Sequence, residues 1–416
     1  MSELVFAVST VLLAFITGVL LVWFLMAMSY FRGGRRQYHG RPAGATVVIP
    51  AYNEEGTIGE CIDAVLGSDY PKKLLEVILV DDGSTDDTVR IARTKGVKVI
   101  SQNHLGKVEA LNKGVFSAKN GIVVTIDADT MVERQAIREL VKPFSDKRIG
   151  SVSGIAKVQN GSGLLSSFQR VEYVYNFFIR EVSSSLFRSS LGICGALSAY
   201  RTSLLRQLGG FKKTTASEDF DIALHIRKMG YGVITADRAR GYTIVPDTMQ
   251  ALTKQRIRWG RGVFQSLVKH RDILFTGRAS FAMSYLLAIQ LFWYVYAIFA
   301  FPMFTYQVFY WLPYNTGSAF DLFFYLLRWV SIAGPLWMVW MIPQWGISAV
   351  TIFGVTAGLL TVALMLLSIR HYNERLDWKA ALAIVFFFPY TLDLTAMFLG
   401  SMVTYARHRG QGVFLK

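Results

Sequence analysis

The sequence predicts two kinds of structure in one chain: an α/β domain built on a parallel β-sheet, and a bundle of apolar transmembrane helices. Between residues 45 and 127, short β-branched runs alternate with segments of helical periodicity, which is the pattern of strands that pair in parallel. Uncharged stretches precede and follow this region, the first at residues 4–29. They are long enough to cross a hydrocarbon core of about 30 Å.

The composition excludes most classes of soluble protein and leaves three explanations for a large positive charge. Hydrophobic residues make up 52% of the 416 residues, and the formal net charge is +15. Such an excess suits nucleic acid, an anionic membrane surface or a phosphorylated substrate. The two cysteines, Cys61 and Cys194, are too few for a disulfide scaffold, and neither has a partner at a metal-ligand spacing.

The first apolar stretch predicts an N-terminal transmembrane helix over residues 1–31. A signal peptide is the alternative, but the run is too long, no basic segment precedes it and no small-residue cleavage site follows. Four arginines without an acid come next: Arg32, Arg35, Arg36 and Arg41. By the positive-inside rule, this side of the membrane is cytoplasmic.

The C-terminal region, residues 281–406, predicts about four further spans. The apolar runs lie near residues 282–311, 319–342, 346–369 and 380–403. Five spans in total place the basic tail, residues 407–416, in the cytoplasm. The loop 370–379 opposes this count, because it holds Arg370, Arg375 and Lys379 and would then lie outside. An interfacial or re-entrant segment in place of one span is therefore the alternative.

Residues 32–248 predict a cytoplasmic domain of alternating strands and helices. The strand of ATVVIP is followed by a helix with Ile58, Ile62, Val65 and Leu66 on one face, and LLEVILV is the second strand. Further elements are expected at 86–95 (helix), 97–100 (strand), 107–119 (helix) and 121–127 (strand). This order implies a parallel sheet covered by helices on both faces, with ligands at the carboxyl ends of the strands.

Polar motifs occupy these strand ends: PAYNEE, DDGSTD and DADT. Neither a Walker A motif nor GxGxxG follows a strand, which excludes the phosphate loops of ATPases and dinucleotide enzymes. In extended chain, Asp127 and Asp129 point to the same side, and two converging carboxylates suit Mg²⁺ or Mn²⁺ with a diphosphate. A turn with helix-capping acids is the alternative. Asp82 either accepts hydrogen bonds from a nucleoside or serves the tight turn that Gly83 permits.

Two predicted helix starts carry further candidates. Lys107 opens one helix, where lysine and N-terminus both attract phosphate, although a solvated surface lysine explains it equally well. In SEDFD, Ser217 is the expected N-cap, and Asp219 is the candidate general base for a sugar hydroxyl. Asp221 and His225, one turn apart, could mimic a metal pair, but facing the next helix or solvent is the preferred interpretation.

The segment 249–280 is amphipathic, rich in cations and includes QRIRWGRG. One helical face collects Gln255, Arg258, Trp259 and Gly262. That face suits a ligand: Arg258 would bind a diphosphate and Trp259 would stack on a sugar ring. Arg256 and Arg261 are expected to contact lipid headgroups instead. Upstream, residues 164–190 predict either an amphipathic helix against the membrane or an ordinary core helix.

Seven motifs occur in order between residues 46 and 262: PAYNEE, DDGS, GKVEALNKG, DADT, GALSAYR, SEDFD and QRIRW. The set resembles the processive, membrane-embedded branch of glycosyltransferase family 2, which includes poly-N-acetylglucosamine, hyaluronan, chitin and cellulose synthases. In length and layout the chain is most similar to the poly-N-acetylglucosamine synthases. The resemblance implies a GT-A fold for the cytoplasmic α/β domain, a nucleotide-sugar donor and inversion at the anomeric carbon.

The resemblance also implies a role for each matching residue. The nucleoside of the donor is contacted, with Lys107 nearby, by Tyr52, Glu54 and Asp82. Asp127 lies by the ribose or diphosphate and shares the Mg²⁺ or Mn²⁺ ion with Asp129, while Asp219 is the base. The diphosphate and the acceptor end are held by Gln255, Arg258 and Trp259, with Gly195 to Tyr200 beside the acceptor.

The expected protein is a multi-pass plasma-membrane enzyme that extends a β-linked polysaccharide processively from a UDP-sugar, with UDP-N-acetylglucosamine as the first candidate. Its expected partners are the donor, the growing polymer, the lipid bilayer and accessory export subunits, but no nucleic acid. The alternatives are hyaluronan- or glucan-type synthesis, and transfer of a single sugar to a lipid acceptor, which QRIRW disfavours. A third interpretation is a transporter or nucleic-acid-binding membrane protein without catalysis. It does not explain why acidic residues follow the strands.

Overall fold

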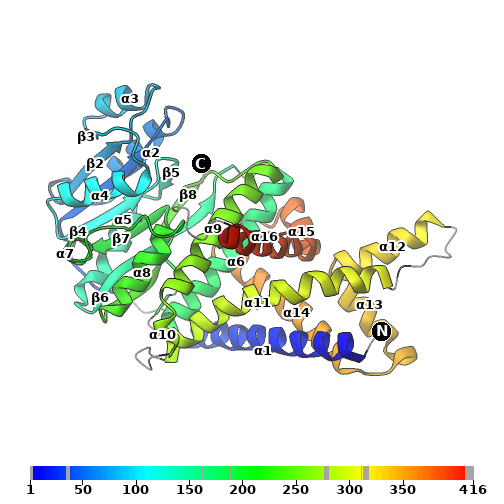
Figure 1. Cartoon of the computed structure of the whole chain (residues 1–416). Coiled ribbons are helices and arrows are strands. Elements are labelled where there is room, and N and C mark those ends of the chain that lie inside the picture. Colours follow the sequence, from blue (N-terminus) through cyan, green and yellow to red (C-terminus); the bar gives the residue numbers. More distant parts are fainter. Residues whose placement is uncertain are drawn as a thin grey trace.

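In the computed structural model, an α/β domain is joined to a set of long apolar helices (Figure 1). The structure describes residues 3–33, 38–160, 163–187, 189–190, 192–275, 281–310, 312 and 318–407. Arg35, Arg36 and the basic tail beyond Arg407 therefore lie outside the described residues.

One eight-stranded sheet organises the domain, in the order β3-β2-β1-β4-β7-β6-β8-β5. The strands are β1 (Ala45–Ala51), β2 (Leu75–Asp81), β3 (Lys98–Ser101), β4 (Ile122–Ile126), β5 (Thr130–Val132), β6 (Ile149–Val158), β7 (Leu197–Arg201) and β8 (Gly232–Thr243). Strands β3, β2, β1 and β4 are parallel as predicted, but β7 and β5 run antiparallel to their neighbours. A purely parallel sheet is a wrong prediction, because strict alternation stops after β4, where only a short turn leads into β5.

Helices bury both faces of the sheet. They are α2 (Ile58–Leu66), α3 (Thr88–Thr94), α4 (Lys107–Ser117), α5 (Ala136–Val141), α7 (Thr202–Gln207) and α8 (Glu218–Lys228), with the 3₁₀ turns η1 (Lys72–Leu74) and η2 (Lys142–Ser145). Since alternate side chains of a strand point to opposite faces, Val47 and Ile49 of β1 pack with α2 and α5, and Val48 packs with α4 and α8. The predicted helices and strands between residues 45 and 127 are confirmed to within two residues at each end.

Two longer helices connect the sheet to the apolar helices: α6 (Leu164–Phe187) and α9 (Met249–Lys269). Helix α6 packs against α1 (Glu3–Gly33) and α14 (Ala349–His371), and it also contacts β6 and β8. These contacts favour a core helix over a helix whose apolar face meets lipid. Helix α9 lies along α16 (Phe387–Arg407), and the short α10 (Asp272–Phe275) follows it.

Within the described residues, three helices are long and apolar enough to cross a membrane: α1, α11 (Phe281–Tyr310) and α14. Two further pairs pass this test only together. Helix α12 (Ala319–Val330) meets α13 (Ala333–Trp345) at a bend of 106°, and α15 (Trp378–Val385) meets α16 at 63°. The four expected C-terminal spans are thus two unbroken helices and two bent pairs. Extended backbone at Ser331 ends α12 and explains the larger bend.

The loop between α14 and α15 contacts the sheet domain directly. Lys157 of β6 forms an ion pair with Glu374 at 2.7 Å, and Arg170 of α6 pairs with Asp377 at 2.9 Å. The loop 370–379 therefore lies on the same side as the domain. These contacts favour the interfacial or re-entrant alternative over five spans, because five spans would put the three cations of the loop on the side opposite the domain.

Candidate active site

The loops that follow β1 and β2 join into one rim. Asn53 has a left-handed backbone (φ 54°), its amide oxygen accepts a hydrogen bond from Thr85 N at 2.8 Å, and its N–H donates to Ser84 Oγ at 3.0 Å. Tyr52 is 43% exposed on this rim and stacks on His104, with ring centroids 4.1 Å apart. An aromatic face is therefore available where the sequence places the nucleoside.

Asp82 is buried and holds the loop that leads into α4. Its carboxylate accepts hydrogen bonds from Gln102 Nε2 at 2.7 Å, Leu105 N at 2.8 Å and Gly106 N at 2.9 Å. Both oxygens thus serve the loop, and the geometry makes Asp82 a support for Lys107, the next residue. Its contact with a nucleoside stays a prediction.

Lys107 links two acidic motifs that are far apart in the sequence. Its Nζ lies 2.6 Å from Asp127 Oδ1 and 3.7 Å from Glu218 Oε1. Burial lowers the pKa of Lys107, but the two carboxylates outweigh this and raise the pKa above its usual value. The ammonium is therefore held charged between DADT and SEDFD, where it can meet a phosphate.

Asp127 and Asp129 lie in the turn between β4 and β5, not in the extended chain that the sequence predicts. In the part of the chain that the structure describes, no cationic side chain forms an ion pair with Asp129. Burial, followed by the charge of Asp127, raises the pKa of the Asp129 carboxyl. Glu54 lies near both acids, and burial together with their charges raises its pKa as well.

A divalent cation fits this turn. It would stabilise the charged form of Asp129 and Glu54, whose pKa values are raised first by burial and then by the neighbouring acids, and carboxylate oxygens are the ligands that Mg²⁺ prefers. Among the described residues, Asp129 has no ion-paired cation and could bind the metal with its whole carboxylate, whereas Asp127 already forms an ion pair with Lys107.

Asp219 lies in the first turn of α8, beside the GALSAYR motif. A Cβ on Gly195 would come within 2.9 Å of Asp219 Oδ2, so glycine leaves room for the carboxylate. Burial, reinforced by Glu218, raises the pKa of Asp219 to about 6, which suits a general base that works near neutral pH. Ser217 is the N-cap residue of α8 as expected, but its side chain forms no capping hydrogen bond: the hydroxyl donates instead to the carbonyl of Trp259, at 3.4 Å.

Helix α9 brings QRIRW to the start of α8. A Cβ on Gly262 would lie 2.4 Å from Ser217 N, so this close approach of the two helices requires glycine. Arg258 is exposed and Trp259 half-buried. The side-chain oxygen of Gln255 is buried without a hydrogen-bond partner among the described residues. Trp259 thus meets the start of α8 two residues before Asp219, and the ligand contacts of Gln255, Arg258 and Trp259 stay predictions.

Arg256 is buried, and its predicted contact with lipid headgroups is wrong. Its guanidinium lies 2.9 Å from Glu172 Oε2 and 4.5 Å from the centre of the Trp259 ring. Tyr390 of α16 donates a hydrogen bond to the same Glu172. Because α6 and α16 cover this side of α9, Arg256 fixes the Trp259 ring relative to both helices.

Asp221 and His225 face α9, as preferred, and meet His270 there. Their ligand atoms lie within 4.8 Å of one another. The Lys269 ammonium, however, already contacts both Asp221 oxygens, at 2.9 and 2.8 Å. A cation thus stands where a metal would be bound, and the cluster is an ion-pair network.

The family model described as "Glycosyltransferase like family 2" matches residues 42–262. The chain belongs to glycosyltransferase family 2. The matched range of this glycosyltransferase includes every predicted site residue, from Tyr52 to Trp259.

Its curated relatives include two poly-beta-1,6-N-acetyl-D-glucosamine synthases. That of Staphylococcus epidermidis (strain ATCC 35984 / RP62A) is 28% identical over 237 residues, which are 56% of this chain and 57% of the relative. That of Staphylococcus aureus (strain MSSA476) is 29% identical over 232 residues, 54% and 56% of the two chains. The match therefore spans just over half the length of each relative.

A solved structure covers nearly the whole glycosyltransferase. The mannosyltransferase PcManGT from Pyrobaculum calidifontis, in complex with GDP-Man and Mn²⁺, is 22% identical, with a TM-score of 0.61 over 96% of this chain and 98% of that one. This likeness supports the fold, a GT-A domain with apolar helices. The predictions of fold class and enzyme class are confirmed.

Proposed function

We propose that this enzyme is a processive, inverting glycosyltransferase that extends a β-linked polysaccharide from UDP-N-acetylglucosamine. The observation that carries the proposal is the position of Lys107, which joins Asp127 to Glu218 next to the base candidate Asp219. Donor and acceptor groups thus converge at one edge of the sheet, where α/β folds bind ligands. The names of the staphylococcal relatives support the sugar and the polymer.

The donor side comprises the rim and the turn after β4. Tyr52 and Glu54 would contact the nucleoside, and Asp82 holds the loop of Lys107. Lys107 and Asp127 would receive the diphosphate. When bound by Asp127 and Asp129, Mg²⁺ or Mn²⁺ would neutralise the charge of the leaving diphosphate.

On the acceptor side, Asp219 accepts the proton of a hydroxyl group of the acceptor sugar. The oxygen of that hydroxyl group attacks the anomeric carbon of the donor. The bond from that carbon to the diphosphate breaks, the nucleoside diphosphate leaves, and the configuration inverts. Gln255 and Arg258 hold the diphosphate by hydrogen bonds. Trp259 stacks on the terminal sugar of the acceptor.

The membrane region of the proposal has three crossings: α1, α11 and α14. By the positive-inside rule, the arginines after α1 support a cytoplasmic domain on a plasma-membrane protein. The loop 370–379 is ion-paired to that domain, so α12 and α13 between the two later crossings add no net crossing and form a re-entrant pair. Helix α16 lies along α9 at the interface, and the polymer leaves among the crossing helices.

Transfer of a single sugar to a lipid acceptor is the second candidate. It is favoured by one observation: within the described residues only three helices are unbroken and long enough to cross, which is few for a polymer channel. Product length separates the two candidates, because a processive enzyme releases long chains before it restarts.

The test uses the full chain in nanodiscs, with UDP-N-acetylglucosamine, UDP-glucose, UDP-glucuronate and GDP-mannose, each with Mg²⁺ and with Mn²⁺. We expect UDP release from UDP-N-acetylglucosamine and a high-mass product on a gel. Products limited to single-sugar lipids would contradict processivity. Turnover of another donor alone would contradict the choice of sugar.

A further inference from the structure

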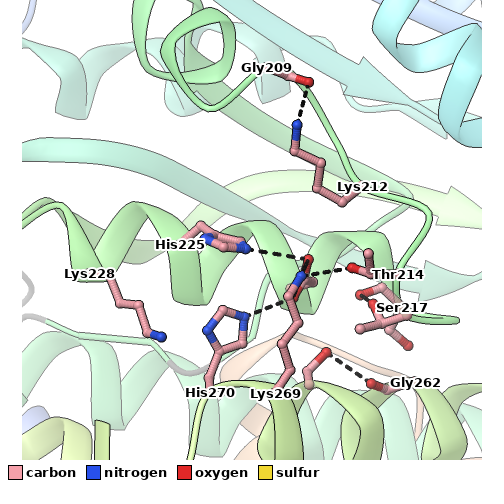
Figure 2. Close-up of polar contacts among 12 residues, drawn as sticks. Gly209, Lys212, Thr214, Ser217, His225, Lys228, Gly262, Lys269 and His270 are labelled. Atoms are coloured by element: carbon pink, nitrogen blue, oxygen red, sulfur yellow. Dashed lines mark hydrogen bonds and ion pairs between the residues drawn. The ribbon is translucent and has the colours of Figure 1, made fainter. Parts of the chain in front are cut away.

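A polar network around a buried carboxylate joins the helix of the base to the end of the QRIRW helix (Figure 2). Asp221, on α8 two residues after Asp219, has a side chain only 1% exposed. Lys269 donates to both of its oxygens, and His270 Nε2 lies 2.8 Å from Oδ1. Lys269 also donates to Thr214 Oγ1 at 2.7 Å. The network therefore ties α8 and the loop before it to α9.

A second set of contacts holds the start of α8 to α9. It lies about two helical turns N-terminal to Lys269 on α9. The N–H of Ala216 donates to Gln265 Oε1 at 2.9 Å, and the hydroxyl of Ser217 donates to the carbonyl of Trp259. Gly262 lies between these contacts and allows the close approach. When both sets of contacts are formed, α8 can neither rotate nor slide along α9 without breaking one of these hydrogen bonds.

Helix α9 is in turn fixed to apolar helices. The hydroxyl of Tyr294, on α11, donates to the carbonyl of Gly260 at 2.7 Å. Phe264 of α9 packs on Tyr405 of α16, with ring centroids 5.1 Å apart. A continuous set of contacts thus runs from α11 and α16 through α9 to the first turn of α8.

The position of Asp221 is not explained by folding of α8 alone. A carboxylate this deeply buried is stable only when it is paired, and the helix would be buried equally well by an apolar residue. The pairing partners, Lys269 and His270, come from one neighbouring segment, so the carboxylate specifies how α8 sits on α9.

We propose that Asp221 and Lys269 are positioning residues that set the carboxylate of Asp219 at the attack position without touching the substrate. The inference rests on the proposed role of Asp219 as the base. Displacing a reacting group by about 1 Å can lower a rate about a hundredfold. We call the Asp221–Lys269 pair the clamp. Its loss frees α8, whereas α9 with Gln255 and Arg258 stays fixed to α11 and α16, so kcat should change much more than the donor KM.

The test compares variants of the full chain in nanodiscs. Lys269→Met removes the ammonium, Asp221→Asn removes the carboxylate charge, and Lys269→Arg retains the cation. Lys228→Met is the matched control: it breaks another lysine–aspartate pair of α8, with Asp272 at 2.7 Å, whose side chains are 32% and 56% exposed. Each is assayed with UDP-N-acetylglucosamine, or with the sugar that the wild type turns over best in the donor panel above.

We expect kcat to fall about tenfold or more in Lys269→Met and Asp221→Asn, with the donor KM within about twofold. Lys269→Arg should recover most of kcat, and Lys228→Met should match the wild type. The Lys269→Met, Asp221→Asn double variant should be no worse than the worse single variant, because the pair acts as one unit. If Lys269→Met does not fold, Asp221→Asn and Lys269→Arg decide.

Unchanged kcat in the folded variants, a Lys269→Arg variant as slow as Lys269→Met, or a rise in KM alone would overturn the proposal. One equivalent of zinc in the purified wild type that is lost in His270→Gln would overturn it too, in favour of a metal centre. A wrong donor or product assignment appears in the wild type itself. A wrong positioning role appears only in the comparison of the variants with an active wild type.

Discussion

The two acidic motifs of the site differ in how the structure balances their charge. Asp127 has the Lys107 ammonium at 2.6 Å, and it lies in an open turn with Asp129. Asp219 forms no ion pair among the described residues, and burial raises its pKa to about 6. In the proposed mechanism, the same residue type serves two tasks. The strand-end acids hold cations, and the helix-start acid accepts a proton.

The largest expected effect comes from Asp219→Asn. The amide keeps the shape of the side chain but cannot accept the proton, so we expect turnover to fall about a thousandfold. Release of UDP by folded protein measures it. Asp87→Asn, which removes an exposed pair with Arg90, is the control and should keep full turnover. Equal rates in Asp219→Asn and the control would show that the helix-start acid is not the base.

Asp129→Asn should have the next largest effect, about a hundredfold loss of turnover. The amide removes the charge that holds the cation, so the activity should need a higher Mn²⁺ concentration and recover in part when Mn²⁺ is raised. Titration of turnover against Mn²⁺ for both acidic motifs separates them: Asp219→Asn should not recover at any concentration.

The same comparison can be made between two arginines of α9. Arg256→Gln leaves the buried Glu172 unpaired and should lower the free energy of unfolding by about 3–5 kcal/mol. Arg258→Gln, on the exposed side, should change stability by less than about 0.5 kcal/mol but slow turnover. Thermal unfolding in detergent checks the first effect. A similar loss of stability in both variants would contradict the assigned environments.

The smallest effect is the pH dependence of kcat. The base must be deprotonated, so a pKa raised to about 6 predicts that kcat rises with pH through 6 and is half-maximal there. An unperturbed aspartate would give a midpoint near about 3.9. The fall between pH 7.5 and pH 6 is therefore about twofold. A rate that stays constant down to pH 5 would show that Asp219 is not desolvated.

The sequence predicts the first half of the domain well because periodicity and strand-end motifs are local. It fails where tertiary contacts decide: the Ser217 hydroxyl makes no capping hydrogen bond because it donates to the carbonyl of Trp259 on the neighbouring helix α9, and Arg256 is covered by helices distant in sequence. The bend at Ser331 is equally hidden, since hydropathy reports apolar length and not direction. The helical spacing of Asp221 and His225 indicates that the two side chains lie together. Nothing in the sequence predicts that Lys269 pairs with Asp221.

The central claim is that the strand-end acids bind the metal ion and the donor, whereas Asp219 acts as the base. Its most direct test measures binding of the nucleotide without turnover. Mn²⁺-dependent UDP binding is followed by calorimetry in the wild type, in Asp219→Asn and in Asp129→Asn, all in nanodiscs. We predict that Asp219→Asn binds UDP as the wild type does while transferring no sugar, and that Asp129→Asn loses the Mn²⁺-dependent part of binding. Equal loss of binding in both variants, or sugar transfer at the wild-type rate by Asp219→Asn, would contradict the account.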